Sequence, residues 1–266
     1  VRPGLDDKVL TEWNALMITA LAEAGAACDE PTWIEAAVRA ASFLCERSRV
    51  DGRWMRSWKG RAHILAFSAD HAALVEAFVT LHEATGDPRW LDEAVTTADA
   101  LLALFADPDG FGVCTSGTDG DVLVARPKEL MDNATACATS MTALGLLRLS
   151  ALTDDARHRA AAVEIVDALV DAAGRVPLGF GHLLEAAEFA RLGSAEILVS
   201  GDRADLVAEV QRRWTPRAVL TWGTPGSSPL WQGRTDGPGA AHVCRSMTCA
   251  LPATTVAALT AQLDEL

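Results

Sequence analysis

One short stretch of the sequence occurs twice, each time at the start of a helical pattern. Residues 31–38 have the sequence PTWIEAAV, and residues 88–95 have PRWLDEAV, 57 positions further along the chain. In both copies Pro stands at the first position of the predicted helix, where its missing N–H costs no hydrogen bond. Apolar residues then follow at helical spacing. The repeat predicts a chain built from helical pairs of similar construction.

Helical periodicity extends from both copies and dominates the chain up to about Gly193. We expect helices over residues 7–27, 31–49, 70–85 and 88–105, with Ser68 capping the third, and a further pair over 133–152 and 154–173. Residues 133–153 contain a single charge, Arg148, whereas the next helix is rich in charges. A helix that is apolar nearly all round is buried on most sides. The first helix of each pair is therefore predicted to be inner and the second outer.

This alternation predicts a mainly α fold, a partial (α/α)6 toroid of helical hairpins, with a curved α-solenoid as the alternative. Trp33 and Trp90 hold the same repeat position and are expected to pack between outer and inner helices. Extended segments follow the outer helices at residues 52–59 and 110–126. The second is expected to be a β-hairpin with arms at 111–114 and 122–124. Such segments on one rim would frame a funnel.

The pattern changes after Gly193. A buried-strand run at residues 196–200, a helix over 202–214 and a second strand at 218–222 predict a compact βαβ unit. Its turn lacks a GxGxxG fingerprint, so no dinucleotide site is expected. A third strand at 241–247 and a helix over 254–266 complete the chain. We therefore divide it into the toroid part, 1–193, and a small α/β extension, 194–266.

Composition excludes several classes of function. The net charge of −13 argues against a nucleic acid or an anionic membrane as partner. No uncharged run is long enough for a membrane span, and no zinc or other metal-binding or cofactor motif occurs. The six cysteines form no CxxC pair, so we expect free thiols in the cytoplasm. Cys244 and Cys249 are close enough in the sequence to suggest a redox role. We predict instead that they are two thiols in a terminal core strand.

Charged and polar residues gather at the predicted starts of three inner helices, which open onto one rim. Adjacent carboxylates beside a lysine suit acid–base chemistry, and cations at a helix start suit an anion or a sugar hydroxyl. Helix caps and solvated ion pairs explain the same residues, and this alternative stays open. The candidate catalytic residues are Asp6, Asp7 and Asp70. The candidate substrate-binding residues are Lys8, Trp13, Asn14, Trp58, His71, Arg126, Lys128, Asp132 and Asn133. His182, before a further helix, is ambiguous.

Three ordered motifs carry a resemblance to a known family. They are DDKVLTEWNALMI at residues 6–18, RPKE at 126–129 with DNAT at 132–135, and VC at 243–244 with TCALP at 248–252. In this order they resemble the spermatogenesis-associated thioredoxin-like proteins and their bacterial relatives. The sequence departs from the family pattern at Ala15, where the family has Gly, and at His71, where it has Tyr. It departs again after Thr135, which weakens a pocket role there.

The resemblance implies a longer protein, with a thioredoxin-like domain before a six-hairpin toroid similar to N-acylglucosamine 2-epimerases and related glycosidases. Because the chain begins with Val1, we expect it to be a piece of such a protein. The leading hypothesis is a toroid that binds or acts on a carbohydrate-type ligand, without a cofactor. The alternatives are a non-catalytic scaffold or client-binding module for the thioredoxin-like domain, and an inactive truncated product. Whether the chain is an enzyme stays open.

Overall fold

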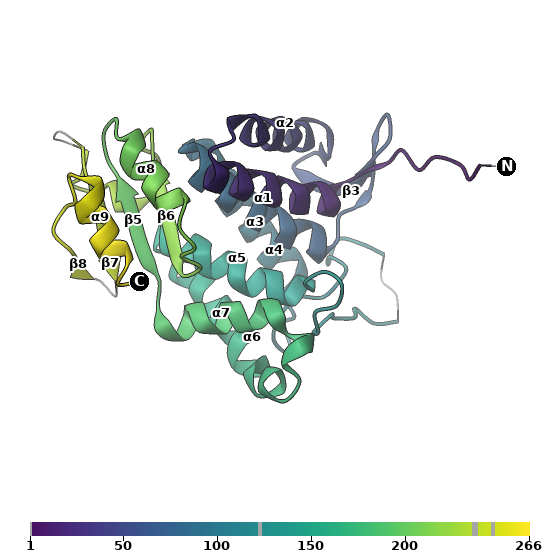
Figure 1. The fold of residues 1–266 in the computed structure, drawn as a ribbon. Coiled ribbons are helices and arrows are strands. Elements are labelled where there is room, and N and C mark those ends of the chain that lie inside the picture. The colour runs from purple at the N-terminus through teal and green to yellow at the C-terminus, as the bar shows by residue number, and fades with distance from the viewer. Residues whose placement is uncertain (1, 122–123, 236–238, 246–247) are drawn as a thin grey trace.

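The structure is a computed structural model that describes residues 2–121, 124–235, 239–245 and 248–266. An arc of helices leads into a smaller α/β unit (Figure 1). The inner helices are α1 (Thr11–Cys28), α3 (Ser68–Thr85), α5 (Ala138–Thr153) and α7 (Gly181–Leu192), each packed on the next. The outer helices are α2 (Pro31–Arg47), α4 (Pro88–Phe105) and α6 (Ala156–Arg175), each packed on the inner helix before it. The predicted alternation of inner and outer helices is confirmed.

The helix ends follow local chemistry. Pro31 and Pro88 stand at the first turns of α2 and α4, as the repeat predicts. The first helix begins later than expected, at Thr11, because Val9 and Leu10 pair with a strand as β1. The expected cap of α3 is wrong. Phe67 is the residue before the helix, and the buried hydroxyl of Ser68 has no hydrogen-bond partner among the described residues.

The tryptophans of the two repeat copies differ in how deeply they are buried in the core of the arc. Trp90 is 1% exposed and stacks on Phe78 of α3, with ring centroids 5.8 Å apart. Trp54 packs against the same phenylalanine and donates its indole N–H to Thr97. Trp33, at the equivalent position of α2, is 41% exposed, so its predicted packing is wrong. The pair α1–α2 lies at the end of the described arc, and among the aromatic ring pairs of the described residues none includes Trp33.

The extended segments lie at the ends where the inner helices begin. The first is β3 (Arg53–Trp58), which pairs with β1 (Val9–Leu10), β2 (Arg49–Val50) and β4 (Ala62–Leu65). The hairpin expected within residues 110–126 is wrong for its first arm, where Val113 makes one isolated bridge with Ala106. Residues 122–123 of the second arm lie outside the described residues. The first arm instead folds back on α4, and Cys114 donates to the Phe105 carbonyl at 2.8 Å.

The α/β unit has its own apolar core of strand and helix side chains. Strands β5 (Ala195–Val199) and β6 (Ala218–Trp222) are parallel and connected through α8 (Ala204–Gln211), so the predicted βαβ unit is confirmed. On the other side of β5 lie β7 (Ala241–Arg245) and then β8 (Thr248–Cys249), and the last helix, α9 (Val256–Leu263), packs beside α8. Short 3-10 turns occupy Pro177–Gly179 and Pro229–Trp231. The boundary after residue 193 stays a prediction.

This unit packs against the ends of the inner helices. Trp222 donates its indole N–H to the Glu83 carbonyl at 2.8 Å, and His82 lies 2.9 Å from the Thr221 hydroxyl. Cys244 and Cys249 form a disulfide, so the prediction of free thiols is wrong for this pair. They face each other because the β7–β8 register makes them direct partners. Among the described residues, no helix is long and apolar enough to cross a membrane.

Candidate functional site

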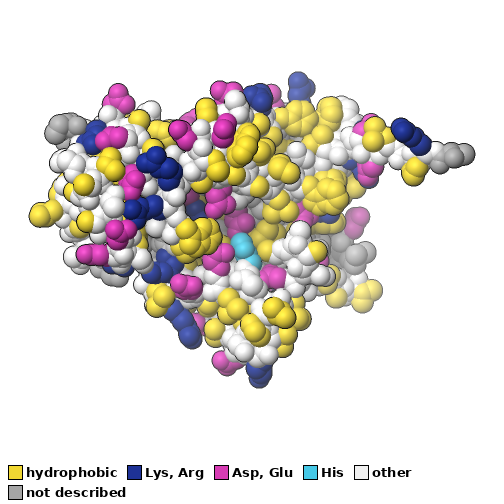
Figure 2. Space-filling model, viewed as in Figure 1, with side chains coloured by type: hydrophobic (Ala, Val, Ile, Leu, Met, Phe, Trp, Pro, Cys, Tyr) yellow, Lys and Arg dark blue, Asp and Glu magenta, His cyan; other side chains and the backbone are white. Residues whose placement is uncertain are grey.

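The concave side of the arc carries a band of charged side chains. Figure 2 shows this face, with acidic side chains and a histidine near its centre. The inner helices are otherwise apolar and tightly packed, particularly α3 and α5. Charges retained on such helices are expensive unless they are paired or functional. The concave-face cluster, as we name it, consists of Glu76, Glu83, Arg148, His182 and Glu185.

His182 and Glu76 form the centre of this cluster. Glu76 Oε1 lies 2.7 Å from His182 Nε2, and Glu185 Oε2 lies 3.9 Å from the other ring nitrogen. Asp132 fixes the start of α7, because its carboxylate accepts the His182 amide at 2.9 Å. Its second oxygen accepts the Cys137 amide at the start of α5, at 3.0 Å. Asp132 therefore sets the spacing of two inner helices and the place of the imidazole.

The electrostatics of this group favour proton exchange. Burial by itself lowers the pKa of His182, but the hydrogen bond to Glu76 and the charges of Glu76, Glu185 and Asp132 outweigh it and raise that pKa. Burial raises the pKa of Glu185. An imidazole that protonates readily thus lies beside a carboxyl group that holds its proton more tightly than usual. A histidine and a carboxyl group whose pKa values are both raised are the residue types that exchange protons with a ligand.

A cavity of about 130 Å³ adjoins the cluster where the arc meets the α/β unit. Glu83 and Arg148 lie in its wall and form an ion pair of 2.5 Å. Burial raises the pKa of Glu83, while the charge of Arg148 opposes that shift. Glu185 and Trp214 also line the cavity. A small polar ligand in this space would therefore meet charged groups and one aromatic surface.

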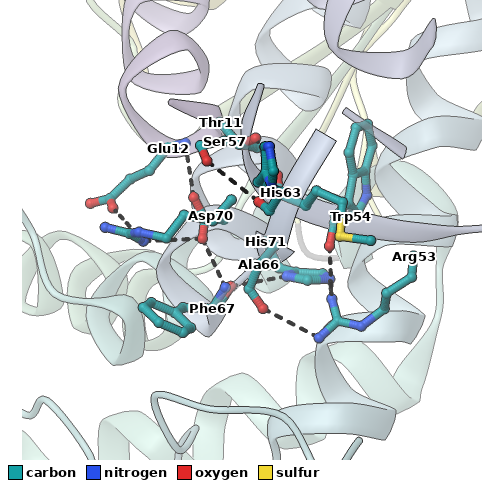
Figure 3. Close-up of polar contacts among 12 residues, drawn as sticks. Thr11, Glu12, Arg53, Trp54, Ser57, His63, Ala66, Phe67, Asp70 and His71 are labelled. Atoms are coloured by element: carbon teal, nitrogen blue, oxygen red, sulfur yellow. Dashed lines mark hydrogen bonds and ion pairs between the residues drawn. The ribbon is translucent and has the colours of Figure 1, made fainter. Parts of the chain in front are cut away.

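Asp70 lies at the other end of α3, within a network that Figure 3 displays. Its carboxylate is 1% exposed and accepts the Phe67 amide at 2.8 Å and the Glu12 amide at 3.0 Å. Arg56 of β3 lies 3.2 Å from Asp70 and 3.6 Å from Glu12. Burial raises the pKa of Asp70 despite these partners. The network ties α1, β3 and α3 together at the rim.

His71, predicted to bind substrate, is fully buried. Its Nδ1 lies 3.0 Å from the Phe67 carbonyl, so Nδ1 donates there and Nε2 accepts from Arg53 at 3.1 Å. Burial lowers the pKa of His71 to about 4, so the ring is neutral near pH 7. Asp119 in turn holds Arg53 at 2.7 Å. In the described structure, the ring of His71 faces packed protein and no open surface.

The other candidates from the first motif lie on the surface. Asp7 pairs with Lys59, and Lys8 with Asp6, all on exposed segments. Asn14 donates its side-chain amide to the Leu10 carbonyl at 2.8 Å, near the start of α1. Trp13 is 67% exposed. Trp58, predicted to stack on a sugar, packs edge-on against Phe43, with centroids 5.3 Å apart. The structure does not bring Asp6 or Asp7 into contact with Asp70.

The second motif organises the loop before α5. Arg126 donates to the carbonyls of Ser116 and Leu104, and Lys128 binds Asp107 at 2.6 Å. Asn133 is exposed. With Asp132 anchoring two helix starts, these side chains shape the rim, and their predicted role in substrate binding stays a prediction. Sequence reasoning missed Glu12, Arg56 and most of the concave-face cluster, although isolated charges in apolar inner helices, such as Arg148, were a usable signal.

No family model matches the chain. Human spermatogenesis-associated protein 20 is 29% identical over 280 residues, which cover 95% of this chain and 36% of that protein. The mouse protein of the same name is 29% identical over 211 residues, 74% of this chain and 27% of that protein. The chain thus spans about a third of the length of the curated relatives it matches. The resemblance to the spermatogenesis-associated proteins is supported by these two homologues, which carry that name.

Two solved structures share the fold. The unsaturated glucuronyl hydrolase of Bacillus sp. GL1 has a TM-score of 0.54 at 18% identity, covering 71% of this chain and 61% of that one. The GH76 α-mannanase of Bacteroides thetaiotaomicron has a TM-score of 0.54 at 13% identity, covering 99% of this chain and 72% of that one. These likenesses show the α/α toroid fold, so the predicted fold class is confirmed.

Proposed function

We propose that the concave face binds a carbohydrate-type ligand and that His182, with Glu76 and Glu185, exchanges protons with it. One observation carries the proposal: a hydrogen-bonded histidine–carboxylate pair, beside a second carboxyl group of raised pKa, lies on the concave side of an α/α arc. The two solved proteins that share the fold are carbohydrate-acting enzymes by name, which supports the ligand class. Because one fold hosts many functions, the residues carry more weight than the likeness.

The cluster has chemistry suited to a sugar. Carboxylates accept hydrogen bonds from adjacent hydroxyl groups, and Arg148 donates to ring or hydroxyl oxygens that approach the cavity. Glu76 orients the imidazole of His182 through its hydrogen bond of 2.7 Å. His182 then delivers or removes a proton at a hydroxyl or an adjacent carbon of the ligand, and Glu185 serves as its counterpart. Trp214, 78% exposed at the cavity, offers a flat apolar surface to a sugar ring.

The test is a ligand panel measured by thermal unfolding and by product analysis. Neutral hexoses, amino sugars, uronic acids and sugar phosphates are screened against the chain. At least one saccharide class is expected to stabilise it, and His182→Gln is expected to remove that stabilisation. His63→Gln on β4 is the matched control, since its ring contacts Arg61 away from the cluster. Stabilisation retained in His182→Gln contradicts the proposal, as does a panel without any ligand.

The same assay tests the predicted roles of Asp6, Asp7 and Asp70. Asp7 lies on an exposed segment, where Lys59 lowers the pKa of its carboxyl group through a hydrogen bond. If Asp7→Asn abolishes ligand binding while His182→Gln leaves it intact, the site belongs to the N-terminal motif. The opposite result assigns it to the concave-face cluster.

A second function is favoured by the exposed apolar stripe on α1. Trp13 is 67% exposed and Met17 is 58% exposed, one helical turn apart. Apolar residues gathered on one exposed helix face are typical of an interaction surface. In this alternative the chain is a non-catalytic scaffold that docks a thioredoxin-like domain of a longer protein. Binding of such a domain, lost in Trp13→Ala, in a chain that responds to no saccharide supports this function.

A further inference from the structure

The disulfide of the α/β unit joins two strands at a surface position. Cys244 in β7 and Cys249 in β8 are direct partners in an antiparallel register. Cys244 is buried, with 5% of its surface exposed, whereas Cys249 is exposed. An incoming nucleophile therefore reaches the sulfur of Cys249 and not that of Cys244. Attack at one sulfur releases the other, so Cys244 is the leaving group.

A guanidinium group contacts both sulfurs. Arg234 Nη2 lies 3.3 Å from Cys244 Sγ and 3.1 Å from Cys249 Sγ. The other terminal nitrogen of Arg234 donates to the Leu230 carbonyl at 3.1 Å, which fixes the side chain. Among the ion pairs of the described residues, none involves Arg234. Its guanidinium group therefore faces the sulfur atoms, and no carboxylate of residues 2–121, 124–235, 239–245 or 248–266 forms an ion pair with it.

The contact with Arg234 stabilises the reduced cysteine pair more than it stabilises the disulfide. A disulfide sulfur is neutral and a weak hydrogen-bond acceptor, whereas a thiolate beside a guanidinium gains a charge-assisted bond. Cationic neighbours lower the pKa of a cysteine and make its thiolate a better leaving group. The backbone bond from Ala250 to the Val243 carbonyl, at 2.9 Å, holds the two strands together without the covalent link. Reduction would thus leave both sulfurs in place for reoxidation.

We propose that Cys244, Cys249 and Arg234 form a reversible dithiol–disulfide site that a protein dithiol reduces. The thiolate of the reductant attacks Cys249 Sγ, the bond between the two sulfurs breaks, and Cys244 leaves as a thiolate beside Arg234. The second thiolate of the reductant then attacks the reductant's other sulfur, which is bonded to Cys249 in the mixed disulfide. The bond to Cys249 breaks, and Cys249 leaves as a thiolate. The reductant loses two electrons and becomes a disulfide. The protein gains those electrons and two protons, one for each cysteine.

The experiment follows the folded chain in mixtures of reduced and oxidised glutathione, with alkylation and peptide mass mapping. Trypsin separates the two cysteines, because Arg245 lies between them and no later Lys or Arg follows in the sequence. The pair is expected to interconvert reversibly while the circular dichroism spectrum is unchanged. Disulfide that resists reduction until the chain is unfolded overturns the proposal, because the bond is then purely structural.

Two further measurements test the roles of the individual residues. A thioredoxin whose resolving cysteine is replaced by serine is the probe, and it is expected to be trapped on Cys249. Trapping on Cys244 alone refutes the assigned direction of attack. Arg234→Gln is expected to slow reduction about three- to tenfold, because the leaving thiolate loses its cation. Arg212→Gln removes the same charge from an exposed position on the α/β unit, and an equal effect in this control overturns the role of Arg234.

Discussion

The hydrogen bond between Glu76 and His182 predicts a stability change that depends on pH. In Glu76→Gln the imidazolium keeps a neutral acceptor but loses the negative charge 2.7 Å away. The side chains of Glu76 and His182 are 13% and 23% exposed, so solvent screens their interaction only in part. A hydrogen bond to a charged group contributes about 1.5–3 kcal/mol to the free energy of unfolding. We expect Glu76→Gln to lose most of that amount at low pH.

The sign follows from the direction of the pKa shift. The folded protein raises the pKa of His182 above its ordinary value of 6.5. The stabilisation is therefore complete below pH 6.5 and is lost as the pH rises through the folded-state pKa. The difference in unfolding free energy between wild type and Glu76→Gln should be larger at about pH 5.5 than at about pH 8.5, because the imidazolium loses its proton as the pH rises through the folded-state pKa.

Urea unfolding followed by circular dichroism measures this difference at the two pH values. Glu185→Gln is the matched control, because its carboxylate is 3.9 Å from the other ring nitrogen and makes no hydrogen bond to it. Its side chain is also 37% exposed, so its effect should stay below about 1 kcal/mol. An equal loss for Glu76→Gln at both pH values, or a larger loss for Glu185→Gln, refutes the reasoning.

Three further tests probe the fold, each by the change that a substitution causes in the free energy of unfolding. Trp90→Ala should cost about 3–5 kcal/mol because the ring fills the core, whereas Trp33→Ala should cost less than about 1.5 kcal/mol; equal costs contradict the packing described. Arg148→Met should cost about 3–5 kcal/mol by leaving the Glu83 carboxylate unpaired, and adding Glu83→Leu should recover most of it. Asp70→Ala should cost about 2–4 kcal/mol, because two backbone amides and a guanidinium group lose their acceptor. A cost under about 0.5 kcal/mol, the scale of a surface substitution, would show that water replaces the carboxylate and would contradict this role.

Local sequence signals located most of the fold. Pro31 and Pro88 each mark a helix start that the structure confirms, because proline at a first turn acts through backbone chemistry alone. The packing of equivalent residues was harder to predict. Trp33 and Trp90 share a repeat position, but burial depends on which helices lie beside them, and that is a property of the whole arc.

The candidate site was less predictable than the fold. Arg126 and Lys128 suggested anion binding by their charge, but their donors are used by carbonyl oxygens and by Asp107 within the same loop. Residue type cannot show whether a cation is already paired. The pair Glu76 and His182 is 106 positions apart in sequence, and only the packing of α3 on α5 and of α5 on α7 brings them together. The same holds for the disulfide, whose pairing depends on the register of two short strands.

The most direct test of the proposed site is an NMR titration of the histidine side chains with the saccharide that stabilises the chain most. We predict a saturable change in the ring signals of His182 and a shift of its pKa when ligand binds the concave face. The fully buried ring of His71 should report no direct contact. Saturable binding that leaves the His182 signals and pKa unchanged would contradict the central claim that the concave-face cluster holds the ligand.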